Sequence, residues 1–260
     1  MEKSAANAVP PLAGQVAVVT GASGGIGRAI AVELARGGAD VVVHGFRRRE
    51  SAEQVAAAIS DLGRESLTLL ADLADSAARG AFAASAWNWR GGADIWINCA
   101  GADVLTGAAA DWPLERKLEA LWQVDVAATI ALSRIIGSQM RARSRGTIIN
   151  IGWDQAEQGM AGDSGEMFAA IKGAVMAFTR SLAQSLAPQV RVNCLAPGWI
   201  RTAWAEAASE YWQERAKRQS LRGRWGTPED VARAAAFLAS PVADFITGQI
   251  IAVNGGFKYE

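Results

Sequence analysis

The residues with the clearest chemical purpose form a glycine-rich stretch, Thr20–Gly27 (TGASGGIG), close to the N-terminus. This stretch follows an apolar run and opens a helical pattern, which is the context in which such a turn holds the pyrophosphate of a dinucleotide. Gly21 permits the tight turn, Gly25 lets the backbone approach the pyrophosphate, and Gly27 lets helix and strand pack closely. Amide groups at the helix N-terminus would face the phosphates. The stretch predicts a dinucleotide site; a purely structural glycine turn is the alternative.

The end of the second apolar run indicates which dinucleotide is bound. An NAD site usually places an acid there for the ribose 2′-hydroxyl, but no acid occurs between Val43 and Glu50. Arg47 and Arg48 stand there instead, and guanidinium groups pair well with a 2′-phosphate. We therefore predict NADP(H) in preference to NAD(H); a solvated basic run at the start of a helix is the alternative. His44 ends the same strand and lies in the wrong region for a catalytic base.

The composition excludes several other classes of function. The chain has 260 residues, with 26 basic and 26 acidic side chains and a net charge of zero, which argues against a nucleic-acid partner and a polybasic membrane anchor. No apolar run reaches the roughly 18 residues of a membrane span, and we see no secretory signal. Cys99 and Cys194 are the two cysteines of the chain, and we expect them to be reduced thiols in a cytoplasmic protein. A single histidine argues against a multi-histidine metal centre, so we expect no metal.

Short apolar runs alternate with alanine-rich helical patterns along the whole chain. We expect strands at Val16–Thr20, Val41–His44, Ser66–Ala71, Ile95–Asn98, Thr147–Ile151, Val190–Cys194 and Ile250–Val253. We expect helices at Arg28–Arg36, Ala52–Leu62, Ser76–Trp87, Arg116–Arg141, Glu166–Leu186 and Pro228–Ala239. This alternation predicts one α/β domain over residues 1–260, with a Rossmann-like, doubly wound parallel sheet and helices on both faces. The segment 201–224 interrupts this alternation of strands and helices. We expect it to form a lid or substrate loop, or else a plain helical hairpin on the surface.

Further short motifs follow the glycine-rich stretch and are distributed over nearly the whole chain. They are Asp72-Leu73, Asn98-Cys99-Ala100-Gly101, Asn193–Thr202, Ile246–Gln249 and Asn254-Gly255-Gly256. In this order and spacing the chain resembles the short-chain dehydrogenase/reductase family, and its 3-oxoacyl-carrier-protein-reductase-like branch in particular. The resemblance implies a nicotinamide dinucleotide, framed at the adenine by Asp72 and Leu73. The cofactor-binding residues expected from the motifs and the resemblance are Gly21, Ser23, Gly25, Ile26, Gly27, Arg47, Arg48, Asp72, Leu73, Asn98, Ala100, Gly101, Lys172, Pro197, Gly198, Ile200 and Thr202.

The catalytic positions implied by the resemblance are mostly changed. Members of the family carry Asn, Ser, Tyr and Lys; the Tyr donates a proton to a carbonyl oxygen, the Ser holds that oxygen and the Lys binds the ribose. The Tyr-x-x-x-Lys segment corresponds here to Phe168 and Lys172, so the lysine is retained and the tyrosine is not. Trp153 stands at the Ser position and Asp125 at the Asn position. Neither tyrosine of the chain precedes a lysine at this spacing.

These changes favour a substrate whose reduction requires no proton donor. Hydride addition to a ketone builds an alkoxide, which needs an acid or an oxyanion site, whereas an iminium carbon accepts hydride directly. Trp153 and Phe168 would offer aromatic faces to such a cation, and Asp125 a carboxylate. We therefore expect an oxidoreductase acting on an imine or iminium, for example a cyclic imine or a reduced pterin. The alternatives are a carbonyl reductase with a carboxylic acid in place of the tyrosine, and a non-catalytic relative that binds dinucleotide.

Three acids close to these positions could replace the tyrosine as proton donor. Asp154 is the preferred candidate because it has no evident structural role. Asp163 stands where it would cap the helix that carries Lys172, and Glu166 lies in the same helix start. The predicted catalytic residues are Lys172, Asp154, Asp125, Trp153, Phe168 and Asp163.

Tryptophan is frequent, with ten residues. By the resemblance, Trp153, Trp199, Trp204 and Trp212 surround the nicotinamide end, which suits a flat aromatic or cationic small molecule. The resemblance also implies a homotetramer, or else a dimer, through the helices at 116–141 and 166–186 and through the C-terminal strand. Tyr259 in the tail could then approach a neighbouring subunit.

Overall fold

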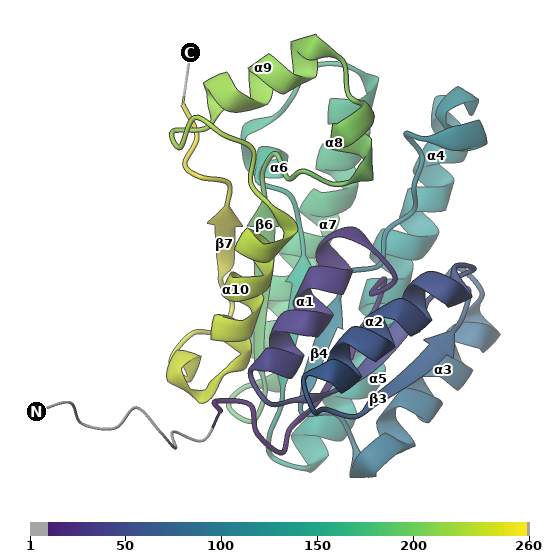
Figure 1. The fold of residues 1–260 in the computed structure, drawn as a ribbon, viewed down its shortest axis with the longest axis vertical. Helices are drawn as coiled ribbons and strands as arrows, with labels where there is room; N and C mark the ends of the chain where they lie inside the picture. Colours follow the sequence, from purple (N-terminus) through teal and green to yellow (C-terminus); the bar gives the residue numbers. More distant parts are fainter. Residues whose placement is uncertain (1–9, 259–260) are drawn as a thin grey trace, which may run out of the picture.

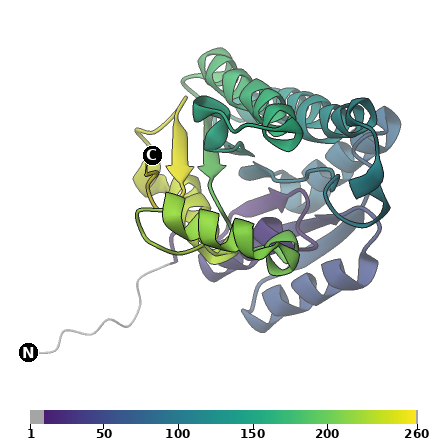
Figure 2. The same ribbon diagram turned by 90° about the horizontal axis from the view of Figure 1, so that it is seen from above.

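A seven-stranded parallel sheet lies between two layers of helices in the computed structural model, which describes residues 10–258 (Figures 1 and 2). The strands are β1 (Val16–Val19), β2 (Asp40–Gly45), β3 (Ser66–Leu70), β4 (Ile95–Asn98), β5 (Thr147–Ile151), β6 (Arg191–Pro197) and β7 (Ile250–Val253). Their order is β3-β2-β1-β4-β5-β6-β7, so the chain changes direction across the sheet between β1 and β4. Open α/β sheets bind ligands at such a switch point, beyond the carboxyl ends of the strands. The predicted doubly wound fold is confirmed.

Helices cover both faces of the sheet, and each layer has its own apolar core. One layer consists of α1 (Gly25–Arg36), α2 (Arg49–Asp61) and α10 (Pro228–Ala239). The other consists of α3 (Ser76–Asn88), α5 (Ala128–Ala142) and α7 (Asp163–Leu186). Every residue of the central strands β1, β4 and β5 is buried, which explains why these strands are apolar along almost their whole length.

The helix expected at 116–141 is divided into three parts. The helix α4 (Leu114–Leu121) leads into a π-turn, η3 (Trp122–Ala127), which continues as α5. A π-turn inserts an extra residue into a helix and often marks a functional site, and here it contains the buried Asp125. The stretch Leu114–Ala142 is long and apolar enough to cross a membrane, but half of its most apolar window is buried inside the protein, as in a core helix.

The segment before the last strand forms a separate cap, which we define as residues 199–226. It contains α8 (Ala203–Ala207) and α9 (Glu210–Gln219) and stands above the carboxyl ends of the strands in Figure 1. Its base is closed by two backbone hydrogen bonds: the Gly226 amide donates to the Trp199 carbonyl (2.8 Å), and the Arg201 amide donates to the Gly226 carbonyl (2.9 Å). The remaining short elements are α6 (Gln155–Gln158), η1 (Trp89–Gly91), η2 (Gly107–Asp111) and η4 (Pro241–Ala243).

Candidate active site

The glycine-rich turn between β1 and α1 requires glycine at two positions. Gly21 has a φ of +67°, and a Cβ there would lie 2.8 Å from the Ala100 Cα. A Cβ at Gly27 would collide with the Gly21 carbonyl, so Gly27 lets the helix approach the turn itself. A Cβ at Gly24 would meet nothing within 4 Å, and no side chain caps the first turn of α1. The turn is therefore open where its free amides could hold an anionic group, which fits a dinucleotide pyrophosphate.

His44 supports this turn from β2. Its Nδ1 accepts a hydrogen bond from the Gly21 amide (3.1 Å), and its Nε2 lies 3.1 Å from the Ala71 carbonyl. Burial lowers the pKa of His44 to about 4, so the ring is neutral at pH 7 and its Nε2–H donates to Ala71. His44 holds two loops together and is not placed as a catalytic base, in keeping with the sequence-based expectation.

Beyond β2 and β3 lie the residues predicted to select the dinucleotide. Arg47 and Arg48 are exposed, and the Arg47 guanidinium lies 4.4 Å from the centre of the Phe46 ring. Within residues 10–258 neither guanidinium has an ion-pair partner, so both are available to a phosphate. Asp72 accepts a hydrogen bond from the Ala74 amide (2.9 Å), and Leu73 is buried in the core.

The side chain of Asn98 at the end of β4 points into the protein. Its amide group donates to the Ser133 hydroxyl and to the Asn150 carbonyl oxygen, both at 2.8 Å, and its own oxygen accepts from the Trp96 indole (2.9 Å). The Thr20 hydroxyl meanwhile accepts hydrogen bonds from the amides that follow Asn98. Only backbone at the Asn98 position is therefore left to face a ligand. Its place in this buried network could not be inferred from the motif.

An ion pair between Asp125 and Lys172 forms the centre of the site. Lys172 Nζ lies 2.8 Å from Asp125 Oδ1, and also 3.3 Å from the Ile151 carbonyl. The second carboxylate oxygen of Asp125 accepts the Ala102 amide (2.9 Å). Burial alone would lower the pKa of Lys172, but the Asp125 carboxylate outweighs that effect and raises it above its usual value. The ammonium group is therefore held charged and fixed between η3, α7 and the end of β5.

Two aromatic rings stand where the resemblance places hydroxyl groups. The rings of Trp153 and Phe168 are 6.3 Å apart in an edge-to-face arrangement, so the two predicted side chains do come together. Phe168 precedes Lys172 by one helical turn on α7 and packs on the cluster that includes Val126 and Ile171. Neither ring carries a hydroxyl donor, and the indole N–H is a weak substitute for a general acid.

Asp154 points away from this pair, toward the carboxyl ends of β6 and β7. Its Oδ2 accepts a hydrogen bond from the Asn254 side chain (3.0 Å), and a Cβ on Gly198 would lie 3.0 Å from the same oxygen. Oδ1 is buried and has no hydrogen-bond partner. Burial raises the pKa of Asp154 to about 6 against the opposing effect of the Asn254 hydrogen bond. Asp154 is thus a buried acid whose pKa of about 6 lies close to neutral pH. A proton donor needs such a pKa.

The expected cap role of Asp163 is wrong. Asp163 is the first residue of α7, the N-cap position is Gly162, and no side chain accepts the free amides there. Gly162 has a φ of +94°, a conformation that favours glycine at this place. Asp163 and Glu166 are both exposed and act only as acids in the first turn of the helix.

The two cysteines are not reactive groups of the site. Burial raises the pKa of the Cys99 and Cys194 thiols to about 12, so neither is a nucleophile at pH 7.

The loop after β6 comes close to the glycine-rich turn. The Thr202 methyl group lies 3.7 Å from the position of a Cβ on Gly25, and Ile200 is buried in the core beside α10. The Gly198 amide donates to the Val253 carbonyl (3.2 Å). The end of the motif that begins with Pro197 is therefore held beside the glycine-rich turn.

Three of the four tryptophans expected at the nicotinamide end pack on one another inside the cap. Trp199, Trp204 and Trp212 have ring centres 5.5 to 6.3 Å apart. Trp225 joins them at 5.8 Å from Trp199 and is almost fully buried. Sequence reasoning missed Trp225, although it lies just beyond the 201–224 segment. Trp153 stays outside this group and pairs with Phe168.

Comparisons with known proteins agree with this arrangement. A family model described as Enoyl-(Acyl carrier protein) reductase matches residues 21–258. The chain is 37% identical over 250 residues to the 3-oxoacyl-[acyl-carrier-protein] reductase FabG of Vibrio cholerae, covering 94% of this chain and 98% of that one. A short chain dehydrogenase from Burkholderia cenocepacia in complex with NADP has a TM-score of 0.83 and 33% identity, covering 95% and 98% of the two chains.

A second solved structure shows that related chains also take the other dinucleotide. It is a 7α-hydroxysteroid dehydrogenase complexed with NADH and 7-oxo glycochenodeoxycholic acid, with a TM-score of 0.87, 30% identity and 97% of each chain covered. Similarity of this extent, in sequence and in fold, covers the glycine-rich turn, the sheet and the cap together. The chain belongs to the short-chain dehydrogenase/reductase family of oxidoreductases, close to its 3-oxoacyl-carrier-protein reductases.

Proposed function

We propose that the protein is an NADP(H)-dependent oxidoreductase that transfers hydride to or from the carbon of a C=N bond. The observation that carries this proposal is the Asp125–Lys172 ion pair, 2.8 Å long, beside two aromatic rings at positions where the family resemblance places hydroxyls. The substrate class is an imine that reacts in its protonated form, or a substituted iminium, such as a cyclic imine or a pterin-like ring; the reacting molecule is flat and cationic. Trp153 and Phe168 would contact this substrate, and Asp125 and Lys172 would lie at the floor of the site.

The chemistry of an iminium explains why the site needs no tyrosine. A bound reduced dinucleotide supplies the hydride. As the new C–H bond forms, the electron pair of the C=N π bond moves to nitrogen, whose positive charge disappears, and the product is a neutral amine. Aromatic faces stabilise the cation before the transfer. Because Asp125 balances the charge of Lys172, the site does not repel a second cation as an unpaired lysine would. A ketone would instead leave an alkoxide, to which neither aromatic ring can donate a hydroxyl proton.

The preference for NADP(H) rests on Arg47 and Arg48. Both guanidinium groups are exposed and free of ion-pair partners within the described part of the chain, and each can form charge-assisted hydrogen bonds to a 2′-phosphate. The relative from Burkholderia cenocepacia binds NADP and the 7α-hydroxysteroid dehydrogenase binds NADH. The fold therefore accepts both dinucleotides, and the side chains after β2 make the choice.

The test compares an imine and a ketone of the same shape. Purified protein is incubated with NADPH and either 3,4-dihydroisoquinoline or 1-tetralone, and loss of NADPH absorbance is followed. We expect reduction of the imine at a rate well above that of the ketone. Ketone reduction at an equal or higher rate would overturn the C=N proposal and favour a carbonyl reductase. Binding of NADP(H) without turnover of either compound would instead favour a non-catalytic relative that binds dinucleotide.

The carbonyl-reductase alternative has one observation of its own, the buried Asp154. Its pKa of about 6 and its unpaired oxygen are the properties of a proton donor. Its direction counts against it, since Oδ2 is held by Asn254 on the side of β7. We therefore keep Asp154 as the second candidate for a catalytic acid.

We also propose that the protein acts in the cytoplasm as a homotetramer or a dimer. Leu114, Leu118 and Trp122 follow one another at four-residue spacing on α4 and η3, and each is 40 to 47% exposed. Such an apolar stripe on a helix surface suits contact with a second copy. Tyr259, the tail residue expected near a neighbouring subunit, lies outside the described residues. Sedimentation of the purified protein would give its oligomeric state directly.

A further inference from the structure

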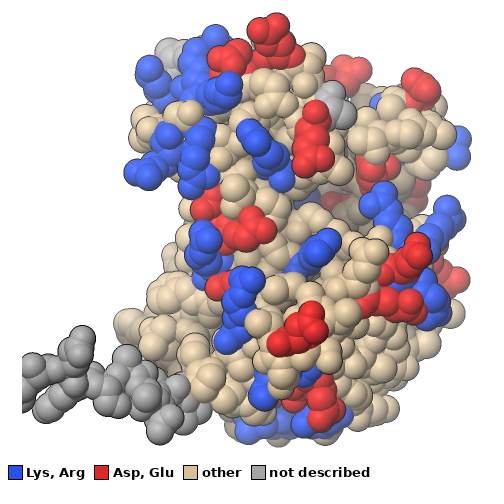
Figure 3. Space-filling view, viewed as in Figure 1, with Lys and Arg blue, Asp and Glu red and all other residues tan. Residues whose placement is uncertain are grey.

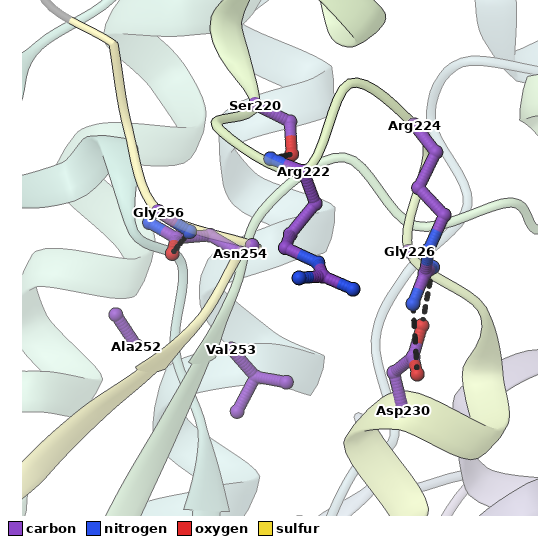
Figure 4. A pocket seen from close by; sticks show the side chains of 10 residues that line it. Ser220, Arg222, Arg224, Gly226, Asp230, Ala252, Val253, Asn254 and Gly256 are labelled. Carbon is purple, nitrogen blue, oxygen red and sulfur yellow. Dashed lines mark hydrogen bonds and ion pairs between the residues drawn. The ribbon is translucent and has the colours of Figure 1, made fainter.

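A cavity of about 350 Å³ opens at the carboxyl end of β7 (Figure 4). It lies between the last turn of the cap and the start of α10, and Asn254 forms part of its wall. The side chain of Asn254 also donates to Asp154, so this residue separates the cavity from the buried acid. The lining residues are Ser220, Arg222, Arg224, Gly226, Asp230, Ala252, Val253, Asn254, Gly255 and Gly256. None of them belongs to the predicted dinucleotide site.

Two arginines and one acid set the charge of this cavity. Arg224 forms two hydrogen bonds to Asp230, at 2.7 and 3.3 Å, drawn as dashed lines in Figure 4. Asp230 is further occupied by the Thr227 amide (2.9 Å) and by Arg233 (3.4 Å). The Arg222 guanidinium has no hydrogen-bond or ion-pair partner among residues 10–258 and projects into open space in Figure 4. One positive charge in the cavity is therefore unbalanced.

The backbone that carries Arg222 is held in place. Its amide donates to the Gly255 carbonyl and to the Ser220 hydroxyl, both at 3.2 Å. Gly255 has a φ of +70°, and a Cβ there would lie 2.6 Å from the Ser220 hydroxyl oxygen, so only glycine allows the two loops to meet this closely. A ligand would thus have to order one side chain and no backbone, which lowers the entropic cost of binding.

The free charge of the cavity comes from Arg222 and not from the nearby helix terminus. At the start of α10 the Thr227 hydroxyl accepts the Asp230 amide, and the Asp230 carboxylate accepts the Thr227 amide. This capping box already satisfies amides that an anion would otherwise use.

The surface around the cavity is basic. The eight residues from Lys217 to Arg224 (KRQSLRGR) contain four basic side chains and no acid. Figure 3 shows Lys and Arg side chains gathered on the surface over α9 and the loop that follows it. Such a field raises the local concentration of small anions and steers them toward the cavity.

We propose that this cavity is an anion-binding site, separate from the dinucleotide site, in which Arg222 pairs with a carboxylate or phosphate group of a small molecule. The planar guanidinium of Arg222 offers two parallel N–H donors to two oxygens of such a group. Arg224, paired with Asp230, forms part of the wall and leaves the free charge of the cavity to Arg222. The ligand class is a small metabolite that carries a carboxylate or a phosphate monoester.

The test measures binding of inorganic phosphate and of acetate to the full-length protein by isothermal titration calorimetry, with and without NADP⁺. The variants are Arg222→Leu, Arg222→Lys and the matched control Arg36→Leu, which removes the same charge from the far end of α1, where Arg36 pairs with Glu33. We expect Arg222→Leu to weaken binding at least tenfold, Arg222→Lys to weaken it a few fold, and Arg36→Leu to leave it unchanged.

The two anions identify the ligand class. Tighter binding of phosphate would indicate a phosphate monoester, and tighter binding of acetate a carboxylate; both support the site. Saturable binding that is equal in wild type and Arg222→Leu would overturn the proposal, as would the absence of saturable binding to the wild type. Because this readout needs no turnover, its result does not depend on the proposed hydride transfer.

Discussion

The Asp125 carboxylate lies 2.8 Å from the Lys172 ammonium, and both groups are largely removed from water, with 2% and 16% of their side chains exposed. Burial disfavours each charge separately, so neither is stable there without the other. The π-turn η3 makes the pair possible because it places the Asp125 side chain in the protein interior. There the Ala102 amide donates a hydrogen bond to the second carboxylate oxygen of Asp125. The site thus has a fixed ammonium group and no net charge from this pair.

Replacing one member of this pair should lower the free energy of unfolding more than replacing both members together. We expect Asp125→Ala and Lys172→Met each to lower the free energy of unfolding by about 3 kcal/mol, because each leaves a buried charge alone. The double variant should lose clearly less than the sum of the two. Urea unfolding of the four proteins gives the coupling energy, and strictly additive losses would contradict a mutually dependent pair.

Asp154 should make stability depend on pH. Its folded-state pKa of about 6 lies above the usual value of 3.8, so folding favours the protonated form. This contribution is fully present below pH 4 and is lost as the pH rises through 6. We therefore expect Asp154→Asn to be more stable than wild type by roughly 1–3 kcal/mol at pH 8, with the difference vanishing near pH 4. Urea unfolding from pH 4 to 8 measures it.

The same substitution distinguishes the two candidate mechanisms. If Asp154 donates a proton to a carbonyl, Asp154→Asn should lower kcat by a hundredfold or more and remove a pH-dependent step near 6 from its profile. For an iminium substrate, kcat should remain within a few fold of wild type. Measuring kcat for the preferred substrate between pH 5 and 8 decides between them.

Restoring the missing hydroxyls should restore ketone chemistry. We expect the double variant Phe168→Tyr and Trp153→Ser to gain reduction of 1-tetralone with NADPH, because the new phenol would lie one helical turn from Lys172 with a new hydroxyl nearby. The variant Phe168→Leu with Trp153→Ala is the matched control for lost aromatic packing. No gain with any ketone tested would place the catalytic tyrosine position elsewhere.

Removing the arginines after β2 should change the choice of dinucleotide. Each charge-assisted hydrogen bond to a phosphate contributes on the order of 1.5–3 kcal/mol, so Arg47→Leu with Arg48→Leu should raise the Kd for NADPH by tenfold or more. The Kd for NADH should stay nearly constant. Quenching of tryptophan fluorescence gives both constants, and Arg36→Leu controls for net charge. An equal loss for both dinucleotides would exclude these arginines as the selecting residues.

The sheet could be predicted from the sequence because each of its central strands is buried on both faces and is therefore apolar along almost its whole length. The strands at Ile95–Asn98, Thr147–Ile151 and Ile250–Val253 and the helix at Pro228–Ala239 have the predicted bounds. The π-turn at Asp125 was missed because the pattern over 116–141 indicates a helix without distinguishing a single π-turn inside it. The inward direction of Asn98 depends on partners from β5 and α5, which only the fold brings together.

The sequence predicted which residues lie at the site better than it predicted which of them contact one another. Spacing placed Phe168 and Lys172 on one face of a helix, and the rings of Trp153 and Phe168 do meet. The ion pair of Lys172 with Asp125 joins residues 47 positions apart, which no spacing rule could anticipate. Asp163 followed a capping pattern in sequence, but Gly162 adopted the left-handed conformation and took the N-cap position instead.

The closed base of the cap has a consequence for how this chain can evolve. The Trp199, Trp204 and Trp225 rings pack with Ala205 and Ala216 in a small core of their own, apart from the clusters that hold the sheet. Substitutions inside it can therefore accumulate without loss of the scaffold. The cap is therefore a separately packed module, whose side chains can change while the core that holds the sheet stays constant.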